Sequence, residues 1–185
     1  GGAEDENYGY SFKYCLKNKL LGVGWTIPNE KREAIDWNKY RKKAIRIYKK
    51  IPQVEYIKNY VSKDCLVWVR NSSNEYYLAK VKSPWEYIDT DDARIADITN
   101  VFKVDIKKIK NPDDVPGKVI ASFRASRTIQ VVSNENILIY SQLLWNELSD
   151  TDYYKIDSRI DNYLDFLTDD EAEDILFIYL QYHGY

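Results

Sequence analysis

Aromatic side chains that lie close to turns are the residues of this 185-residue chain best suited to binding chemistry. They are Trp25, Trp68, Trp85 and Tyr87, and Trp25 directly follows the run Gly22-Val23-Gly24. Aromatic rings hold a nucleic-acid base or a methylated group by stacking, and each stacked base contributes about 1–3 kcal/mol. The spacing therefore predicts an aromatic pocket for a flat ligand.

The element that would position Trp68 is a β-hairpin over residues 63–81. Two β-branched and aromatic runs are separated there by an Asn/Ser turn, which is the pattern of a hairpin. Strand alternation places Trp68 and Arg70 on one face, and an indole beside a guanidinium suits a flat, electron-rich ligand. The alternatives are that Trp68 belongs to the core and that Trp25 is a hydrophobic plug.

Two polar residues stand near the start of a predicted strand over residues 96–106. The carboxylate of Asp97 would accept a hydrogen bond from a base edge, and the amide of Asn100 would accept or donate one. Capping and turn hydrogen bonds are the alternative use of these residue types. We include both in the predicted base-binding set.

Two groups of cations could bind a nucleic-acid backbone. Apolar spacing over residues 31–60 predicts two amphipathic helices, and the first carries Lys42, Lys43 and Arg46. The run 118–132 reads as two short strands. The second group lies at their junction, where guanidinium forks and hydroxyls match phosphate oxygens: Arg124, Ser126, Arg127 and Thr128, with Arg70 added from the hairpin. Ordinary surface charge and structural salt bridges are the alternatives.

The charge is unevenly distributed along the chain. Residues 146–185 hold eleven acidic and two basic residues, a net charge of −9, which leaves 25 basic and 18 acidic residues, or +7, for residues 1–145. A basic body is typical of a polyanion binder. The acidic part is expected to solvate a helix or face another domain.

Few residues are available for catalysis or metal binding. The chain has two cysteines, 50 residues apart, and His183 is its one histidine, so neither a zinc site nor a histidine-dependent triad is expected. We predict no catalytic residues, no metal and no cofactor. No apolar run approaches 18 residues, so we expect a soluble, cytoplasmic protein with no membrane partner.

The helical pattern divides the chain into a predicted domain at 8–148 and a helical appendage at 149–185. A short helix is expected to end near Gly22, and a helix over 137–148 is expected to bury Trp145. The appendage contains a helix with Thr168 as N-cap and an acidic first turn.

Five motifs, in this order, carry a resemblance to a known superfamily: Gly22-Val23-Gly24-Trp25 and the runs 63–70, 77–81, 96–101 and 118–123. Over residues 12–145 the chain resembles the EVE/YTH/PUA-like superfamily, and more narrowly the reader modules of modification-dependent restriction systems. The resemblance implies an α+β fold with a small, curved, barrel-like and mostly antiparallel sheet flanked by helices. It also implies a pocket that takes a flipped, often methylated base between Trp25, Trp68 and Trp85.

Residues 163–185 look similar to the first helix of Mrr-like nuclease domains, which implies a fused nuclease whose catalytic residues would follow. The expected function is recognition of a modified base that targets such a nuclease to DNA, with no enzymatic activity in these residues. An RNA-binding regulator and a protein-interaction module are the alternatives. Salt dependence of binding would separate the last from the others.

Overall fold

The chain folds into two compact units, residues 1–107 and residues 108–185. We call them the first and the second unit. The computed structural model describes residues 5–28, 32–124, 129–157, 160 and 162–184. The domain boundary at residue 148 that we expect from the sequence stays a prediction.

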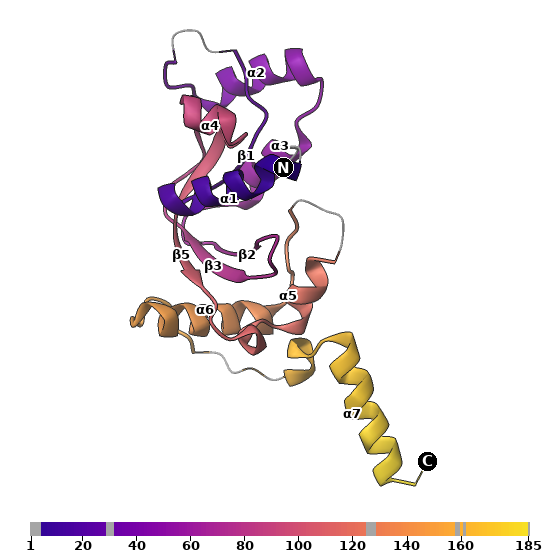
Figure 1. The fold of residues 1–185 in the computed structure, drawn as a ribbon. Helices are drawn as coiled ribbons and strands as arrows, with labels where there is room; N and C mark the ends of the chain where they lie inside the picture. The colour runs from indigo at the N-terminus through magenta and orange to yellow at the C-terminus, as the bar shows by residue number, and fades with distance from the viewer. Residues whose placement is uncertain (1–4, 29–31, 125–128, 158–159, 161, 185) are drawn as a thin grey trace. The chain divides into compact units, whose positions relative to one another are not determined.

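The first unit is an α+β fold around a curled, antiparallel half-barrel sheet with helices on its flanks (Figure 1). Strand β5 is central, because the strand order is β1-β5-β3-β2 and β4 also pairs with β5. The coarse fold class predicted from the sequence is confirmed. The elements of this unit are α1 (Asp5–Asn18), β1 (Leu20–Val23), α2 (Trp37–Tyr48), α3 (Pro52–Tyr60), β2 (Leu66–Arg70), β3 (Tyr76–Val81), β4 (Glu86–Tyr87), α4 (Asp91–Ile95) and β5 (Asn100–Lys108).

The predicted hairpin is confirmed as β2 and β3. Its turn is built by the side chain of Asn71, whose Oδ1 accepts from the backbone N–H groups of Ser73 (3.0 Å) and Glu75 (2.8 Å). Asn74 takes a positive φ of 58°, which asparagine tolerates better than most residues. The turn chemistry therefore fixes the register that places Trp68 opposite Leu78.

The two helices predicted over residues 31–60 are confirmed as α2 and α3. Asp36 caps α2 by accepting from the backbone N–H of Lys39 at 2.9 Å. Pro52 occupies the first turn of α3, where its missing N–H costs nothing. Tyr40 and Ala44, one turn apart, are fully buried, so α2 packs through the face that carries them.

Two predictions are wrong, the end of the first helix and the strand at the start of the run 118–132. The first helix ends at Asn18, and Gly22 lies inside β1, where a Cβ would meet the carbonyl oxygen of Asn100 on the paired strand. The run 118–132 does not begin with a strand, because residues 117–122 form a helix. A short apolar run fits a strand and a buried helix equally well, and Pro116 immediately before this one favours a helix start.

The regular elements that lie wholly within the described residues of the second unit are all helices. Its elements are η1 (Pro112–Asp114), α5 (Gly117–Ser122), α6 (Glu135–Ser149), η2 (Tyr163–Phe166) and α7 (Asp169–Tyr182). The prediction that Trp145 is core is confirmed, since it is 2% exposed beside Leu144 on α6. The Thr168 cap is confirmed as well and forms a full capping box with Glu171.

Asp165 on η2 ties this unit together. Its carboxylate accepts from the ammonium of Lys118 on α5 and, at 3.0 Å each, from the amides of Asn134 and Asn136 at the start of α6. The Lys118 hydrogen bond, followed by those of the two amides, lowers the pKa of Asp165 to about 2. A carboxylate that is hydrogen-bonded in its ionised form stabilises the fold only while it stays ionised.

We expect the second unit to lose stability as the pH falls from about 4 towards about 2. The folded pKa of Asp165 lies below the unfolded value, so its contribution is fully present above the unfolded pKa and disappears as the pH falls through the folded one. Hydrogen exchange of the α6 amides against pH measures the effect. An Asp165→Asn variant should be less protected at neutral pH and lose this acid dependence, whereas matching profiles for the two chains would contradict the assignment.

Candidate functional site

A short segment after β1, residues 24–28, is held against α2 by tyrosine hydroxyls. Tyr40 donates to the carbonyl oxygen of Trp25 at 2.9 Å, and Tyr48 donates to that of Thr26 at 2.5 Å. The two tyrosines are eight residues apart on α2, close to two turns, so they lie on the same side of the helix. We call residues 24–28 the clamped segment.

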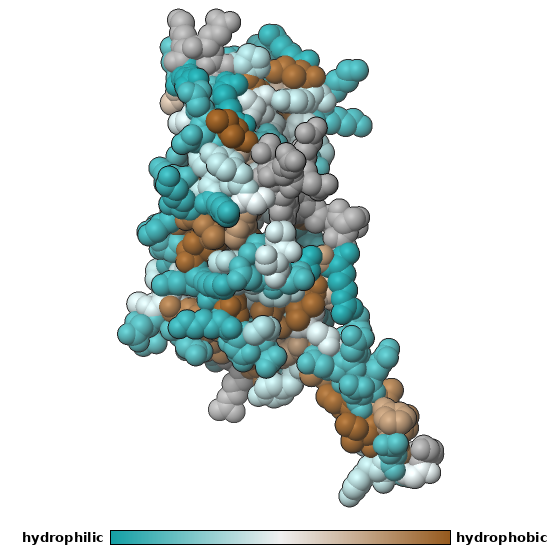
Figure 2. All heavy atoms as spheres, viewed as in Figure 1, coloured by the Kyte–Doolittle hydropathy of each residue, from teal (hydrophilic) through white to brown (hydrophobic). Residues whose placement is uncertain are grey.

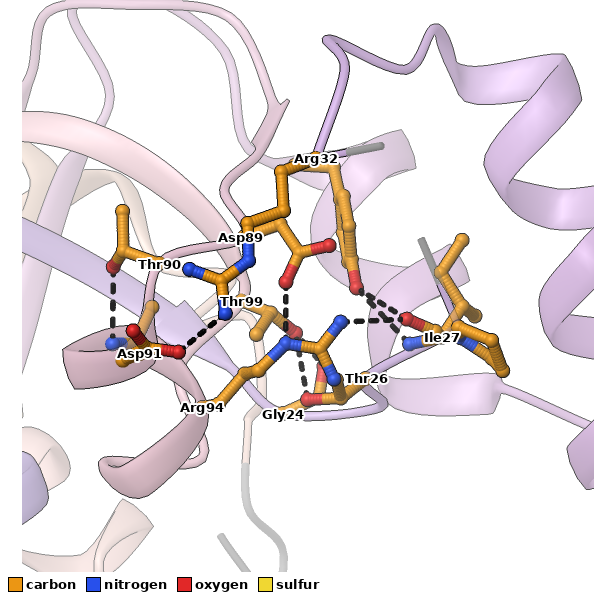
Figure 3. Close-up of polar contacts among 12 residues, drawn as sticks. Gly24, Thr26, Ile27, Arg32, Asp89, Thr90, Asp91, Arg94 and Thr99 are labelled. Atoms are coloured by element: carbon orange, nitrogen blue, oxygen red, sulfur yellow. Dashed lines mark hydrogen bonds and ion pairs between the residues drawn. The ribbon is translucent and has the colours of Figure 1, made fainter. Parts of the chain in front are cut away.

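A second set of contacts holds the clamped segment at Ile27 (Figure 3). The hydroxyl of Tyr87 on β4 accepts from the backbone N–H of Ile27 at 3.0 Å and also lies 3.3 Å from its carbonyl oxygen. Arg94 on α4 donates to the same carbonyl at 3.2 Å, and its guanidinium pairs with Asp89 at 2.5 Å. Burial raises the pKa of Tyr87, so its hydroxyl stays protonated.

Asn100, the first residue of β5, connects three parts of the unit and is fully buried. Its Nδ2 donates to the carbonyl oxygen of Gly24 and, at 2.9 Å, to the hydroxyl of Tyr40. Its Oδ1 accepts from Nε1 of Trp85 at 3.2 Å. Every polar atom of this side chain therefore has a protein partner, and the side chain holds the clamped segment through the carbonyl group of Gly24.

The predicted site residues Trp85 and Tyr87 lie in the core, at 9% and 7% exposed. Both rings pack on Tyr40, with centroids 5.3 and 5.0 Å away, and Trp85 also contacts Trp37 edge-to-face at 5.1 Å. Offset and edge-to-face ring pairs stabilise a core beyond their buried area. In this position the two rings support the site and have little surface left for stacking a ligand.

Trp25 is the predicted site aromatic that stays accessible in this region. It is partly exposed, and its ring contacts Tyr48 edge-to-face, with centroids 5.1 Å apart. Its φ is +68°, a conformation that costs a non-glycine residue about 1–3 kcal/mol and is concentrated at binding sites. The strained backbone conformation is therefore that of Trp25 itself, whereas the sequence predicts unusual backbone conformations at the glycines before it.

Asp97 brings a carboxylate to the same place. It follows the end of α4 with φ of +50°, and its carboxylate lies so close to Gly24 that a Cβ on the glycine would collide with it. Burial is the main cause of the raised pKa of Asp97, and the Asp97 charge adds to the burial that raises the pKa of Tyr48. Among the described residues we find no hydrogen bond to this carboxylate. Trp25, Tyr48 and Asp97 thus form an aromatic pair beside an acceptor, which we call the Trp25 site.

Trp68 and Arg70 lie elsewhere on the sheet. Both are partly exposed on β2, which is the edge strand and is separated from β5 by β3. Both residues have interactions in the structure. They form a face of the hairpin distinct from the hydrogen-bond network around Asn100.

The predicted phosphate-binding residues that the structure describes belong to different elements. Lys43 reaches the clamped segment, with Nζ 3.5 Å from the carbonyl oxygen of Pro28. Lys42 and Arg46, a turn apart, are exposed on the side of α2 opposite the face that packs. Lys43 is therefore the predicted cation that contacts the clamped segment among the described residues.

Arg124 belongs to the second unit and pairs with Asp169 at 3.3 Å, both side chains being exposed. This is the salt-bridge alternative that we weighed for it, and a pair of this kind contributes little stability. The other predicted members of this set lie outside the described residues: Ser126, Arg127 and Thr128.

Tyr40 and Tyr48 are the site residues that the sequence did not reveal. Their signal is a helix stripe, with Tyr40, Ala44 and Tyr48 spaced by four, which we interpreted as an ordinary core face. The stripe does pack, but each hydroxyl also binds a carbonyl of the clamped segment. The sequence signal for this role is a pair of tyrosines at core spacing in a chain that also contains a Gly-x-Gly-Trp run.

No protein-family model matches this chain, and neither does any curated protein or solved structure. Across the described ranges, no helix combines the length and the apolar character that a membrane span requires. In the same residues, no three His, Cys, Asp or Glu side chains are grouped so as to hold a metal ion.

Proposed function

We propose that this chain is a nucleic-acid reader of the EVE/YTH/PUA-like type that recognises a modified base at the Trp25 site. The observation that carries the proposal is the pairing of an accessible tryptophan, strained at positive φ and packed on Tyr48, with the Asp97 carboxylate, for which no hydrogen bond is described. Stacking supplies affinity for any base, and a carboxylate acceptor selects bases that offer an N–H group. The curled sheet and its flanking helices agree with this fold type.

The chemistry of Asp97 narrows the ligand. A carboxylate accepts from the exocyclic amino group of cytosine, adenine or guanine and repels base edges that offer only acceptors. An N6-methylated adenine keeps one N–H for this contact, and its methyl group adds apolar surface for Trp25. A base must leave the stack to reach both side chains, which costs a few kcal/mol that stacking and phosphate contacts offset.

The positive charge of residues 1–145 supports a polyanionic partner. Lys43 at the clamped segment would contact the backbone on either side of the flipped nucleotide. In this proposal the chain binds but does not catalyse, and its role is to target a nuclease, fused or separate, to modified DNA. An RNA regulator would use the same site on single strands, where a base is already unstacked.

The test is a binding panel of oligonucleotides that carry N6-methyladenine, 5-methylcytosine or no modification, each as duplex and as single strand. We expect Trp25→Ala to lower affinity for the preferred modified oligonucleotide by about 5- to 100-fold, because it removes one stacked ring. Affinity for unmodified duplexes should change much less, because they bind mainly through phosphate contacts without a flipped base. Fluorescence anisotropy measures both, and a thermal melt checks that the variant stays folded.

Trp68→Ala is the matched control, because it removes the same ring from the hairpin face. If Trp68→Ala and not Trp25→Ala removed the preference, the reader site would lie on β2. Asp97→Leu adds a second readout, since it removes both acceptor oxygens and should weaken ligands that offer an amino group. Binding that ignores both modification and salt would favour a protein-interaction module instead.

A further inference from the structure

Helix α7 leaves most of its apolar side chains in contact with water. None of its residues is buried, and seven large apolar side chains in its last two turns are 37–86% exposed: Ile175, Leu176, Phe177, Ile178, Tyr179, Leu180 and Tyr182. Figure 2 shows a brown, hydrophobic cluster on α7. Contiguous apolar surface of this kind marks an interaction site.

We propose that α7 is a self-association element that pairs antiparallel with α7 of a second copy of this chain. If each of the seven side chains presents roughly 200 Å² when fully exposed, together they leave on the order of 800 Å² of largely apolar surface open. One partner in a standard protein interface contributes about 800 Å². A single partner helix covers only one side of α7 and buries part of this surface. We therefore expect a weak dimer whose population depends on the protein concentration.

The charge of α7 sets the orientation of the pair. Its first half carries five acidic residues, Asp169, Asp170, Glu171, Glu173 and Asp174, and the helix has no lysine or arginine. In a parallel pair these carboxylates would face their copies across an interaxial distance of about 8–10 Å. Like charges so close disfavour that arrangement.

In an antiparallel pair centred at Ile178 and Tyr179 the apolar halves overlap and the acidic halves point to opposite ends. Each acidic half then lies about 10 Å from the centre, given the 1.5 Å rise per residue, so the two are roughly 20 Å apart. This is about two Debye lengths at physiological salt. In this register Ile175 of one copy meets Tyr182 of the other.

Sedimentation equilibrium of the full chain over a range of concentrations tests the proposal. We expect the mean mass to rise with concentration towards that of a dimer and an Ile178→Glu variant to stay monomeric. The matched control is Leu138→Glu on α6, a residue exposed to a similar extent, 52% against 63%, which should leave association unchanged. Circular dichroism confirms that both variants are folded. A monomer at every concentration overturns the proposal, even if α7 then proves to bind phosphatidylcholine vesicles. Equal loss of the dimer in both variants overturns it as well.

Disulfide trapping tests the orientation. In a Cys65→Ser background, an equimolar mixture of Ile175→Cys and Tyr182→Cys chains should oxidise mainly to the mixed 175–182 disulfide. Disulfides between identical chains, 175–175 and 182–182, would indicate a parallel pair and overturn the antiparallel arrangement. The remaining thiol, Cys15, is buried, and its burial raises its pKa to about 11, so it does not compete.

Discussion

Replacing Asn100 with leucine is expected to destabilise the first unit by about 2–4 kcal/mol, because it removes every hydrogen bond of this buried amide from the core at once. The Nε1–H of Trp85 loses its acceptor, while Gly24 and Tyr40 lose the amide that binds them. A leucine fills the space but satisfies none of these groups. Urea unfolding followed by tryptophan fluorescence measures the loss, since four of the five tryptophans lie in the first unit.

Lys103→Ala is the control on the same strand. Lys103 is exposed, and its ion pair with Glu86 spans 3.2 Å at the surface, so its removal should change the free energy of unfolding by no more than about 0.5 kcal/mol. An unchanged denaturation midpoint for Asn100→Leu would show that the Asn100 amide does not hold the core. Asn100 would then again be a candidate for direct contact with a ligand.

Local signals explain the part of the fold that the sequence predicted. The β2–β3 hairpin depends on a turn of a few residues whose Asn71 side chain binds its own neighbours. Caps act locally too, as Asp36 and Thr168 show by binding backbone N–H groups three residues on. Such contacts join residues that are close in the sequence, so the sequence predicts them.

The candidate site depends on contacts between residues that are far apart in the sequence. Asn100 binds Gly24 and Tyr40, which precede it by 76 and 60 residues. The sequence places Trp85 close to a turn, but the burial of its ring depends on the packing of α2 on the sheet. Asp97 was predicted as a ligand residue from its type. Its position against Gly24 arises because α4 ends there and forces a left-handed turn.

The same network links stability of the first unit to the proposed binding. Tyr40 and Asn100 are buried and hold the backbone of Gly24 and Trp25, so the indole is presented by a rigid support. Rigid presentation lowers the entropy lost on binding. This is why mild changes at the support should weaken binding by loosening Trp25 even when the unit stays folded.

Removing residues 150–185 is expected to unfold the second unit. This truncation deletes Asp165, which leaves the Lys118 ammonium and the amides of Asn134 and Asn136 without their acceptor. It also removes Phe166, whose ring packs edge-to-face on Tyr140 at 5.2 Å. A unit this small depends on each such contact.

A chain ending at Thr168 is the matched comparison, because it keeps η2 and loses only α7. None of the α7 residues is buried, and its ion pair between Asp169 and Arg124 is exposed, so this shorter truncation should melt like the full chain. Hydrogen exchange of the α6 amides separates the two outcomes: protection is lost in chain 1–149 and kept in chain 1–168. Full protection in 1–149 would show instead that α5 and α6 fold without η2, and that residues after 149 are a separable appendage.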